Sequence, residues 1–327
     1  MLLARGRGGA QRWLTLACAG TMVVAGCGGS SHDSGRSGGT IRVSYTVFPE
    51  TLDPALAHSQ SALQTLRTVY TPLLSYDHAD GADGAKIVPG LAEKLPEVSL
   101  DGRTYLFKLR DKLRYSDGTP VHASDFEHAI RRVLRMKSKG ASHFLGILGA
   151  DEYVKAGKPD ADIAGIATSD RTNDLTITLK EPDARFREVL ALEYGALVPG
   201  DTPFSDQTRT PPAGIGPYRL ADVRAGQGYE LVKAPGFALG GQPAGKLDRL
   251  VVSASGAADA ASAPADYAAD PPATATAGTR VTQPTTVSTL LFGKRTLTAA
   301  FSDRIDVQNC TVWHPVYSLD LAQLCVK

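Results

Sequence analysis

The stretch from Pro89 to Val133 constrains the fold of this chain more than any other, because it combines three elements in a fixed succession. Residues 104–109 alternate between β-forming and polar side chains, which predicts a half-buried strand after the Asp101–Gly102 turn. Ser116–Gly118 is a second turn signal. Ser124–Glu127 then matches the S/T-x-x-E capping box, and apolar residues follow it at spacings of three and four. The pattern therefore predicts a strand, a turn and an amphipathic helix.

This stretch resembles the family 5 extracellular solute-binding proteins, which are the dipeptide, oligopeptide and nickel receptors of ABC importers. The matching residues occur in order and in register: Gly90-Leu91-Ala92, Ser99, Asp101-Gly102, Thr104-Tyr105, Phe107, Leu109-Arg110, Ser116-Asp117-Gly118 and Pro120. Leu95 stands where the family commonly has Trp. A strand, turn and capped helix in another secreted α/β protein would show the same local physics, so landmarks elsewhere in the chain bear on the choice.

Two such landmarks lie outside this stretch. A predicted strand at 40–47 leads into Leu52–Pro54, which matches the family's L-D-P, and Ile215–Leu220 resembles its G-T-G-P-Y-x-L strand entry. The resemblance implies an α/β fold of the type II periplasmic-binding-protein class, with a mixed-sheet lobe, a smaller α+β domain and a truncated second lobe.

The resemblance and the composition together predict how the chain is organised. The predicted segments are a lipoprotein signal peptide (1–26), a flexible tether (27–39), the first part of the first lobe (40–78), a smaller inserted domain (79–200), the second part of the first lobe (201–252), a linker in place of most of the second lobe (253–286) and a C-terminal segment that returns to the first lobe (287–327). Periodicity predicts helices at 61–70 and 183–192 and strands at 163–167, 175–179, 229–233 and 247–252. The linker is rich in Ala, Pro and Thr, and its few large side chains bury too little apolar surface to offset backbone ordering.

The N-terminus carries the features of an export signal. Arg5, Arg7 and Arg12 precede an apolar stretch at 13–25 that is too short to span a bilayer, and small residues lead into Cys27. This pattern predicts a lipobox, with acyl chains on Cys27 holding the protein at the outer face of the cytoplasmic membrane, in the cell envelope or periplasm. An ordinary signal peptide, with Cys27 incidental, is the alternative.

Cysteine usage agrees with export. Cys18 would be removed with the signal peptide and Cys27 would carry lipid, which leaves Cys310 and Cys325 in the folded body. An even pair in an oxidising compartment predicts a disulfide. Such a bond would close a loop of about fifteen residues and stabilise the fold by about 3 kcal/mol. Two unpaired buried thiols are the alternative.

Composition and motifs argue against nucleic acid, cofactors and catalysis. A formal net charge of +1 offers no field for DNA or RNA. Gly35–Gly39 fits G-x-S-x-G but lies in the tether, and Gly240–Lys246 resembles a phosphate loop but lacks the Ser or Thr that would bind Mg²⁺. Asp77, Asp80 and Asp83 recur at intervals of three, whereas a calcium loop needs ligands at alternate positions. We therefore expect no catalytic residue, metal or cofactor.

By the resemblance, the loop after Asp53-Pro54 lies at the ligand cleft, so Ala57, His58, Ser59 and Gln60 are the candidate ligand-binding residues; the alternative for His58 is a surface residue near the start of the next helix. The implied function is a lipid-anchored, non-enzymatic solute-binding protein that captures short peptides, or a similar solute, for the permease subunits of an ABC importer. The alternative is an internally shortened relative that acts as a surface interaction module or is inactive. Without a second lobe, a ligand would be enclosed on one side only, so its other face would stay exposed to water and binding would be weak.

Overall fold

The structure is a computed structural model of the 327-residue chain, and it describes residues 36–254, 265–269, 279–284, 296–316 and 318–327. These belong to one compact unit, Ser34–Lys327. The predicted signal peptide, Cys27 and the larger part of the predicted tether lie outside the described residues. Within the described ranges, no helix combines the length and apolar character that crossing a membrane requires.

The strands are β1 (Thr40–Tyr45), β2 (Leu74–Tyr76), β3 (Ile87–Pro89), β4 (Glu97–Val98), β5 (Thr104–Lys108), β6 (Ile166–Ser169), β7 (Asp174–Thr178), β8 (Tyr218–Arg224), β9 (Gly228–Lys233), β10 (Arg249–Ala254), β11 (Tyr267–Ala269), β12 (Thr279–Pro284), β13 (Thr296–Phe301), β14 (Trp313–His314) and β15 (Ser318–Leu319). The α-helices are α1 (Gln60–Leu66), α2 (Ser124–Arg135), α3 (Ala150–Ala156), α4 (Phe186–Val189) and α5 (Val307–Cys310). Short 3₁₀ helices are η1 (Gly81–Ala85), η2 (Ala141–His143), η3 (Glu193–Gly195) and η5 (Leu321–Gln323).

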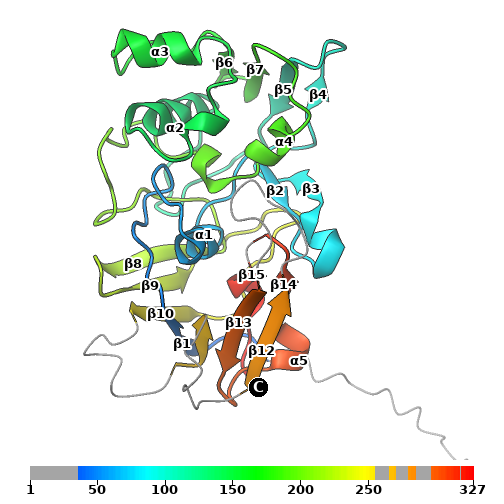
Figure 1. The fold of residues 1–327 in the computed structure, drawn as a ribbon, viewed down its shortest axis with the longest axis vertical. Coiled ribbons are helices and arrows are strands. Elements are labelled where there is room, and N and C mark those ends of the chain that lie inside the picture. The colour runs from blue at the N-terminus through cyan, green and yellow to red at the C-terminus, as the bar shows by residue number, and fades with distance from the viewer. Residues whose placement is uncertain (1–35, 255–264, 270–278, 285–295, 317) are drawn as a thin grey trace, which may run out of the picture. The chain divides into compact units, whose positions relative to one another are not determined.

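A mixed sheet of seven strands, in the order β12-β13-β11-β1-β10-β9-β8, forms the first body of the fold (Figure 1). β1 lies inside this sheet, parallel to both β10 and β11, and the other neighbouring pairs are antiparallel. Ile41, Val43 and Tyr45 of β1 are all buried, as alternation in a strand requires. The mixed sheet confirms the fold class that the sequence predicted.

Helix α1 packs on this sheet through polar as well as apolar groups (Figure 1). Thr65 and the Tyr229 hydroxyl of β9 share a hydrogen bond of 2.6 Å. The amide of Gln64 donates to the Tyr267 hydroxyl of β11 at 3.3 Å and to the Leu319 carbonyl at 2.7 Å. These bonds let polar side chains of the helix be buried without losing hydrogen-bond partners.

Residues 253–286, which the sequence predicts to be a linker, contain two strands of the large sheet. β11 pairs with β1 and β13, and β12 pairs with β13. Tyr267 fixes β11, because it is buried and stacks on Phe301 with ring centroids 5.5 Å apart. The linker prediction is therefore wrong for residues 267–269 and 279–284, because backbone ladder bonds to neighbouring strands let these two segments form strands. The apolar run Val287–Phe292 lies outside the described residues.

The smaller domain is built on an antiparallel sheet in the order β4-β5-β7-β6, with α2 and α3 nearby in the upper part of Figure 1. β5 spans the alternating residues that predicted it: Tyr105 and Phe107 are buried, and Leu106 is exposed. The apolar side of α2, including Phe126 and Ile130, belongs to the same buried core. The predicted strand, turn and helix are thus all present.

The start of α2 differs from the predicted capping box. The hydroxyl of Ser124 donates to Asp170 at 2.9 Å, and Glu127 accepts the backbone N–H of Ile163 at 2.9 Å, so neither caps the helix. Instead Asp125 Oδ2 accepts the N–H of His122 at 2.9 Å. The reciprocal half of a capping box is therefore present, with Asp125 bonded to the backbone of His122 three positions earlier. The S/T-x-x-E motif does not detect this pair, because it requires Ser or Thr at the first position.

Other predicted elements are shorter or shifted. The helix predicted at 183–192 is limited to Phe186–Val189, and the strand predicted at 163–167 starts at Ile166, because the N–H of Ile166 bonds to the Ile163 carbonyl in a turn (2.8 Å). α1 ends at Leu66, although the N–H of Tyr70 still reaches the Leu66 carbonyl at 2.8 Å.

Glycine is required in two of the family landmarks, for a different structural reason in each. Gly118, in the Ser116–Gly118 corner, has φ +92°, a conformation that L side chains rarely adopt. A Cβ on Gly214 would lie 2.3 Å from the Val69 carbonyl oxygen, and one on Gly216 would lie 2.5 Å from the Thr68 carbonyl oxygen. Glycine is therefore required there so that the chain can pass the segment that follows α1.

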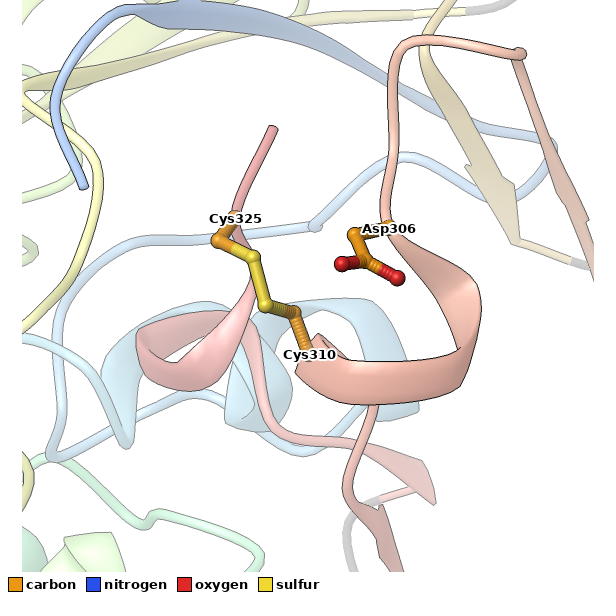
Figure 2. A group of neighbouring side chains, drawn as sticks. All are labelled: Asp306, Cys310 and Cys325. Carbon is orange, nitrogen blue, oxygen red and sulfur yellow. A yellow bond between two sulfur atoms is a disulfide. The ribbon is translucent and has the colours of Figure 1, made fainter. Parts of the chain in front are cut away.

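The C-terminal residues return to the first strand. Arg304 donates to the Thr40 carbonyl at 3.0 Å, and the N–H of Arg36 bonds to the Val326 carbonyl at 2.8 Å. A disulfide joins Cys310 and Cys325, with Cα atoms 5.5 Å apart and a sequence separation of 15 residues (Figure 2).

Candidate ligand-binding loop

The loop between β1 and α1 is held by a buried ion pair. Arg132 of α2 donates from Nη1 to Asp53 Oδ1 at 3.0 Å and from Nη2 to Asp53 Oδ2 at 2.7 Å, and both side chains are at most 1% exposed. The carboxylate also accepts the N–H groups of Ala55 and Gln207, each at 3.0 Å. Arg132 also donates from Nε to the Pro203 carbonyl and from Nη2 to the Ser205 carbonyl. The aspartate of the L-D-P motif therefore fixes the loop to the smaller domain.

The four predicted ligand-binding residues differ in burial and in structural role. Ala57 is fully buried, so its side chain is not available to a ligand. Ser59 caps α1, since its hydroxyl accepts the N–H of Ala62 at 3.2 Å, and Gln60 is the first residue of the helix. The side chains of His58, Ser59 and Gln60 are partly exposed. These three can meet a ligand in solution.

His58 lies between two charged residues that the sequence did not single out. Its Nδ1 is 2.9 Å from Glu50 Oε1, and its Nε2 is 2.7 Å from the Nζ of Lys139. Because an ammonium group can only donate, Nε2 accepts from Lys139, and the proton of the neutral ring lies on Nδ1 and donates to Glu50. The contact thus selects one tautomer of His58.

Glu50 also binds the backbone of the loop. Its Oε1 accepts the N–H groups of His58 at 2.6 Å and of Ser59 at 3.0 Å. Burial raises the pKa of Glu50, but hydrogen bonds from the Ser59 hydroxyl and from these backbone groups outweigh it and lower the pKa below its usual value. The carboxylate is therefore ionised at neutral pH.

No sequence motif marks Glu50 or Lys139. Lys139 is 81 residues from His58 in the chain and is brought to it by the segment between α2 and η2. Glu50 precedes the L-D-P motif and could have been considered as a polar neighbour of the loop. The structure thus adds one anion and one cation to the predicted site.

The disulfide region holds the group of potential metal ligands found among the described residues. The ligand atoms of Asp306, Cys310 and Cys325 lie within 4.8 Å of one another (Figure 2). Both sulfurs belong to the disulfide, and Asp306 accepts the N–H of Asn309 at 3.2 Å as the N-cap of α5. The three residues therefore have structural roles, a disulfide and the N-cap of α5. Cysteine binds a metal as a thiolate, which the disulfide does not offer.

The mixed sheet, the smaller domain and the fixed loop together define a solute-binding protein of the type II periplasmic class. Residues 86–284, more than half of the chain, match the family described as "Bacterial extracellular solute-binding proteins, family 5 Middle". The chain therefore belongs to the family 5 extracellular solute-binding proteins, as the sequence resemblance predicted.

Similar proteins carry peptide-binding names. The chain is 30% identical over 215 residues to the dipeptide-binding protein DppE of Bacillus subtilis, covering 62% of this chain and 38% of DppE. It is 32% identical over 193 residues to the oligopeptide-binding protein OppA of the same species, covering 55% of this chain and 34% of OppA. The chain thus spans well under half the length of these two relatives.

Solved structures agree with the fold. The clavulanic acid biosynthesis oligopeptide binding protein 2 superimposes with a TM-score of 0.60 at 30% identity, covering 67% of this chain and 40% of that one. The pheromone receptor PrgZ gives a TM-score of 0.60 at 22% identity, covering 76% and 51% of the two chains, and at that identity it supports the fold alone.

Proposed function

We propose that this protein captures short peptides outside the cell for an ABC importer, without chemical change to the peptide. The observation that carries the proposal is the match to the family over residues 86–284, together with the loop that Asp53 and Arg132 fix beside β1. Relatives named for dipeptide and oligopeptide binding give the ligand class.

The loop offers a peptide both backbone and side-chain contacts. Backbone pairing in the manner of an added strand supplies affinity in peptide recognition, and nearby side chains adjust specificity. Gln60 and Lys139 would supply hydrogen bonds, and the imidazole of His58, whose two ring nitrogens bond Glu50 and Lys139, would position the ammonium group of Lys139. The ion pair at Asp53 would keep the backbone of the loop in place.

Isothermal titration calorimetry with a mixture of di- to pentapeptides tests the proposal. We expect saturable heat with the wild-type protein and binding about tenfold weaker for the double variant H58A/Q60A, because the amide of Gln60 and the imidazole that positions Lys139 are lost. The matched control is H122A/Q227A, which removes the same residue types from exposed positions elsewhere and should bind as the wild type does. Absence of heat with every peptide would contradict the proposal.

Membrane anchoring through Cys27 is part of the same proposal. In the native host, radiolabelled palmitate should label the wild type but not C27S, and C27S should leave the membrane fraction. Labelling that persists in C27S would exclude this anchor.

A second candidate is a surface interaction module or inactive remnant. The observation that favours it is the coverage of only 38% of DppE and 34% of OppA. Expression in a host that lacks its own peptide receptor decides between the two: restored peptide uptake would exclude the second candidate.

A further inference from the structure

A pocket of about 650 Å³ lies away from the candidate loop, and it is lined by segments of two parts of the fold. One wall is the turn at 110–118 in the smaller domain, and the other is the connection at 234–240 between β9 and β10. Neither the loop at 50–60 nor Lys139 contributes to it. Its volume falls within the range of sites for small organic molecules.

The turn at 110–118 supplies three cationic residues to the pocket lining: Arg110, Lys112 and Arg114. Arg110 is fixed, since Nε donates to the Gly90 carbonyl at 3.0 Å and Nη2 donates to the Gly240 carbonyl at 3.2 Å. Arg114 donates to the Gly118 carbonyl at 2.9 Å. Two of the three charges are therefore positioned by backbone carbonyls.

The third cation, Lys112, has an unusual backbone conformation. Lys112 has φ +59°, in the left-handed region that glycine or asparagine adopts at lower cost. Among the described residues, none forms an ion pair or hydrogen bond with its ammonium group. Non-glycine residues held in this region often occur at ligand-binding positions. Lys112 therefore contributes to the pocket lining a charge that no described residue neutralises.

The carboxylates of the lining are already hydrogen bonded. Asp117 Oδ1 accepts the N–H and the hydroxyl of Thr119 at 2.9 and 2.6 Å, and Asp111 Oδ1 accepts the amide of Asn173 at 3.2 Å. With these two anions against three cations, the lining has a formal charge of +1. A ligand here would thus meet a small excess of positive charge.

The opposite wall is apolar. Phe237 is partly buried and Leu239 is 8% exposed, and both line the pocket together with Ile215. An inorganic ion would leave this surface uncovered, whereas an organic anion would cover it and still reach the cations.

We propose that this pocket binds a small organic anion, a carboxylate or sulfonate with an aromatic or aliphatic body, at a site separate from the peptide loop. The acidic group would contact Lys112 and Arg114, and the apolar body would pack on Phe237 and Leu239. Because the two walls come from the smaller domain and from the β9–β10 connection, the bound ligand would bridge them.

Two fluorescent probes test the proposal: 8-anilino-1-naphthalenesulfonate, which is anionic, and its uncharged analogue N-phenyl-1-naphthylamine. We expect saturable binding of the sulfonate to the wild type. K112G should weaken it about tenfold through loss of a charge-assisted contact, with the uncharged probe unaffected. F237A should weaken both probes. K112G also relieves the backbone strain, so loss of folding would not explain its result.

The matched control is K137G, since Lys137 also has a positive φ, +51°, and is exposed, but does not line the pocket. It should bind both probes as the wild type does. Equal sulfonate binding by K112G and K137G would overturn the proposal, and so would absence of saturable sulfonate binding to the wild type. Displacement of the sulfonate by the peptide mixture would overturn the separate location of the site.

Discussion

The loop before α1 and the C-terminal segment are both anchored by buried polar groups, but they depend on different chemistry. The loop is held by charge, through Asp53 and Arg132. The C-terminal segment is held by the disulfide and by a histidine that must stay neutral: the His314 ring donates from Nε2 to the Asp77 carbonyl at 2.9 Å and accepts the N–H of Val316 at Nδ1 at 3.1 Å. The candidate site should therefore tolerate reducing conditions and mild acid better than the chain end does.

The largest effect should come from breaking the ion pair. D53A leaves the Arg132 guanidinium buried without its partner, which costs about 3–5 kcal/mol. Urea unfolding followed by circular dichroism measures the loss. The double variant D53A/R132M should recover part of it, because no charge then remains unpaired in the core.

The control for the ion pair is D162A. Asp162 pairs with Arg131 at 2.7 Å, but its side chain is 88% exposed, so its removal should change the unfolding free energy little. Equal losses for D53A and D162A would show that the buried pair does not anchor the loop.

Removal of the disulfide should weaken the C-terminal segment. C310S/C325S should lose about 3 kcal/mol, as expected for a closed loop of fifteen residues. Wild-type protein treated with dithiothreitol should lose a similar amount, while the double variant should not respond. If oxidised and reduced wild-type protein unfold at the same urea concentration, the bond does not anchor the C-terminal segment.

Acid should weaken the C-terminal segment through His314. Burial, and next the charge of Arg67, lower the pKa of this histidine well below its usual value. Below pH about 6.5 the unfolded chain takes up a proton that the folded protein resists, so the free energy of unfolding falls as the pH falls, by at most about 2 kcal/mol at pH 5.

H314Q cannot titrate and should show a flatter pH profile between pH 7 and 5, even if it is less stable at pH 7. Asp320 does not titrate in this range. Burial alone would raise the pKa of its carboxyl group, but His78 and Arg67 lower it, so its contribution to the free energy of unfolding is lost only below pH about 4. Parallel profiles for H314Q and the wild type would exclude His314 as the acid-sensitive group.

The smallest effect concerns the corner of the smaller domain. G118A should cost about 1 kcal/mol, because φ is +92° and only the backbone is strained: no atom lies within 4 Å of the added Cβ. G146A is the control, since a Cβ there also meets open space and no positive φ is involved. Equal melting temperatures for the two variants would remove the conformational reason for this glycine.

The sequence predicted the smaller domain well because its elements bury large side chains at regular spacing. Alternation at Tyr105 and Phe107 defined β5, and Phe126 and Ile130 defined the buried side of α2. Turn glycines such as Gly118 could be recognised from their neighbours. Such signals are local, so they can be recognised without knowledge of the fold.

The parts that were missed depend on contacts distant in sequence. β11 is a short strand with two alanines, and it is stabilised by pairing with β1 and β13. Lys139 reaches His58 only in the folded chain. The family resemblance directed attention to residues 57–60, but it gave no information on the charged neighbours of this loop.

Hydrogen–deuterium exchange with and without a saturating mixture of short peptides tests whether the loop before α1 is the ligand site. We expect peptides to slow exchange at residues 55–62 and to leave exchange in the four-stranded sheet of the smaller domain unchanged. Peptide binding without added protection at residues 55–62 would contradict the assignment of this loop as the ligand site.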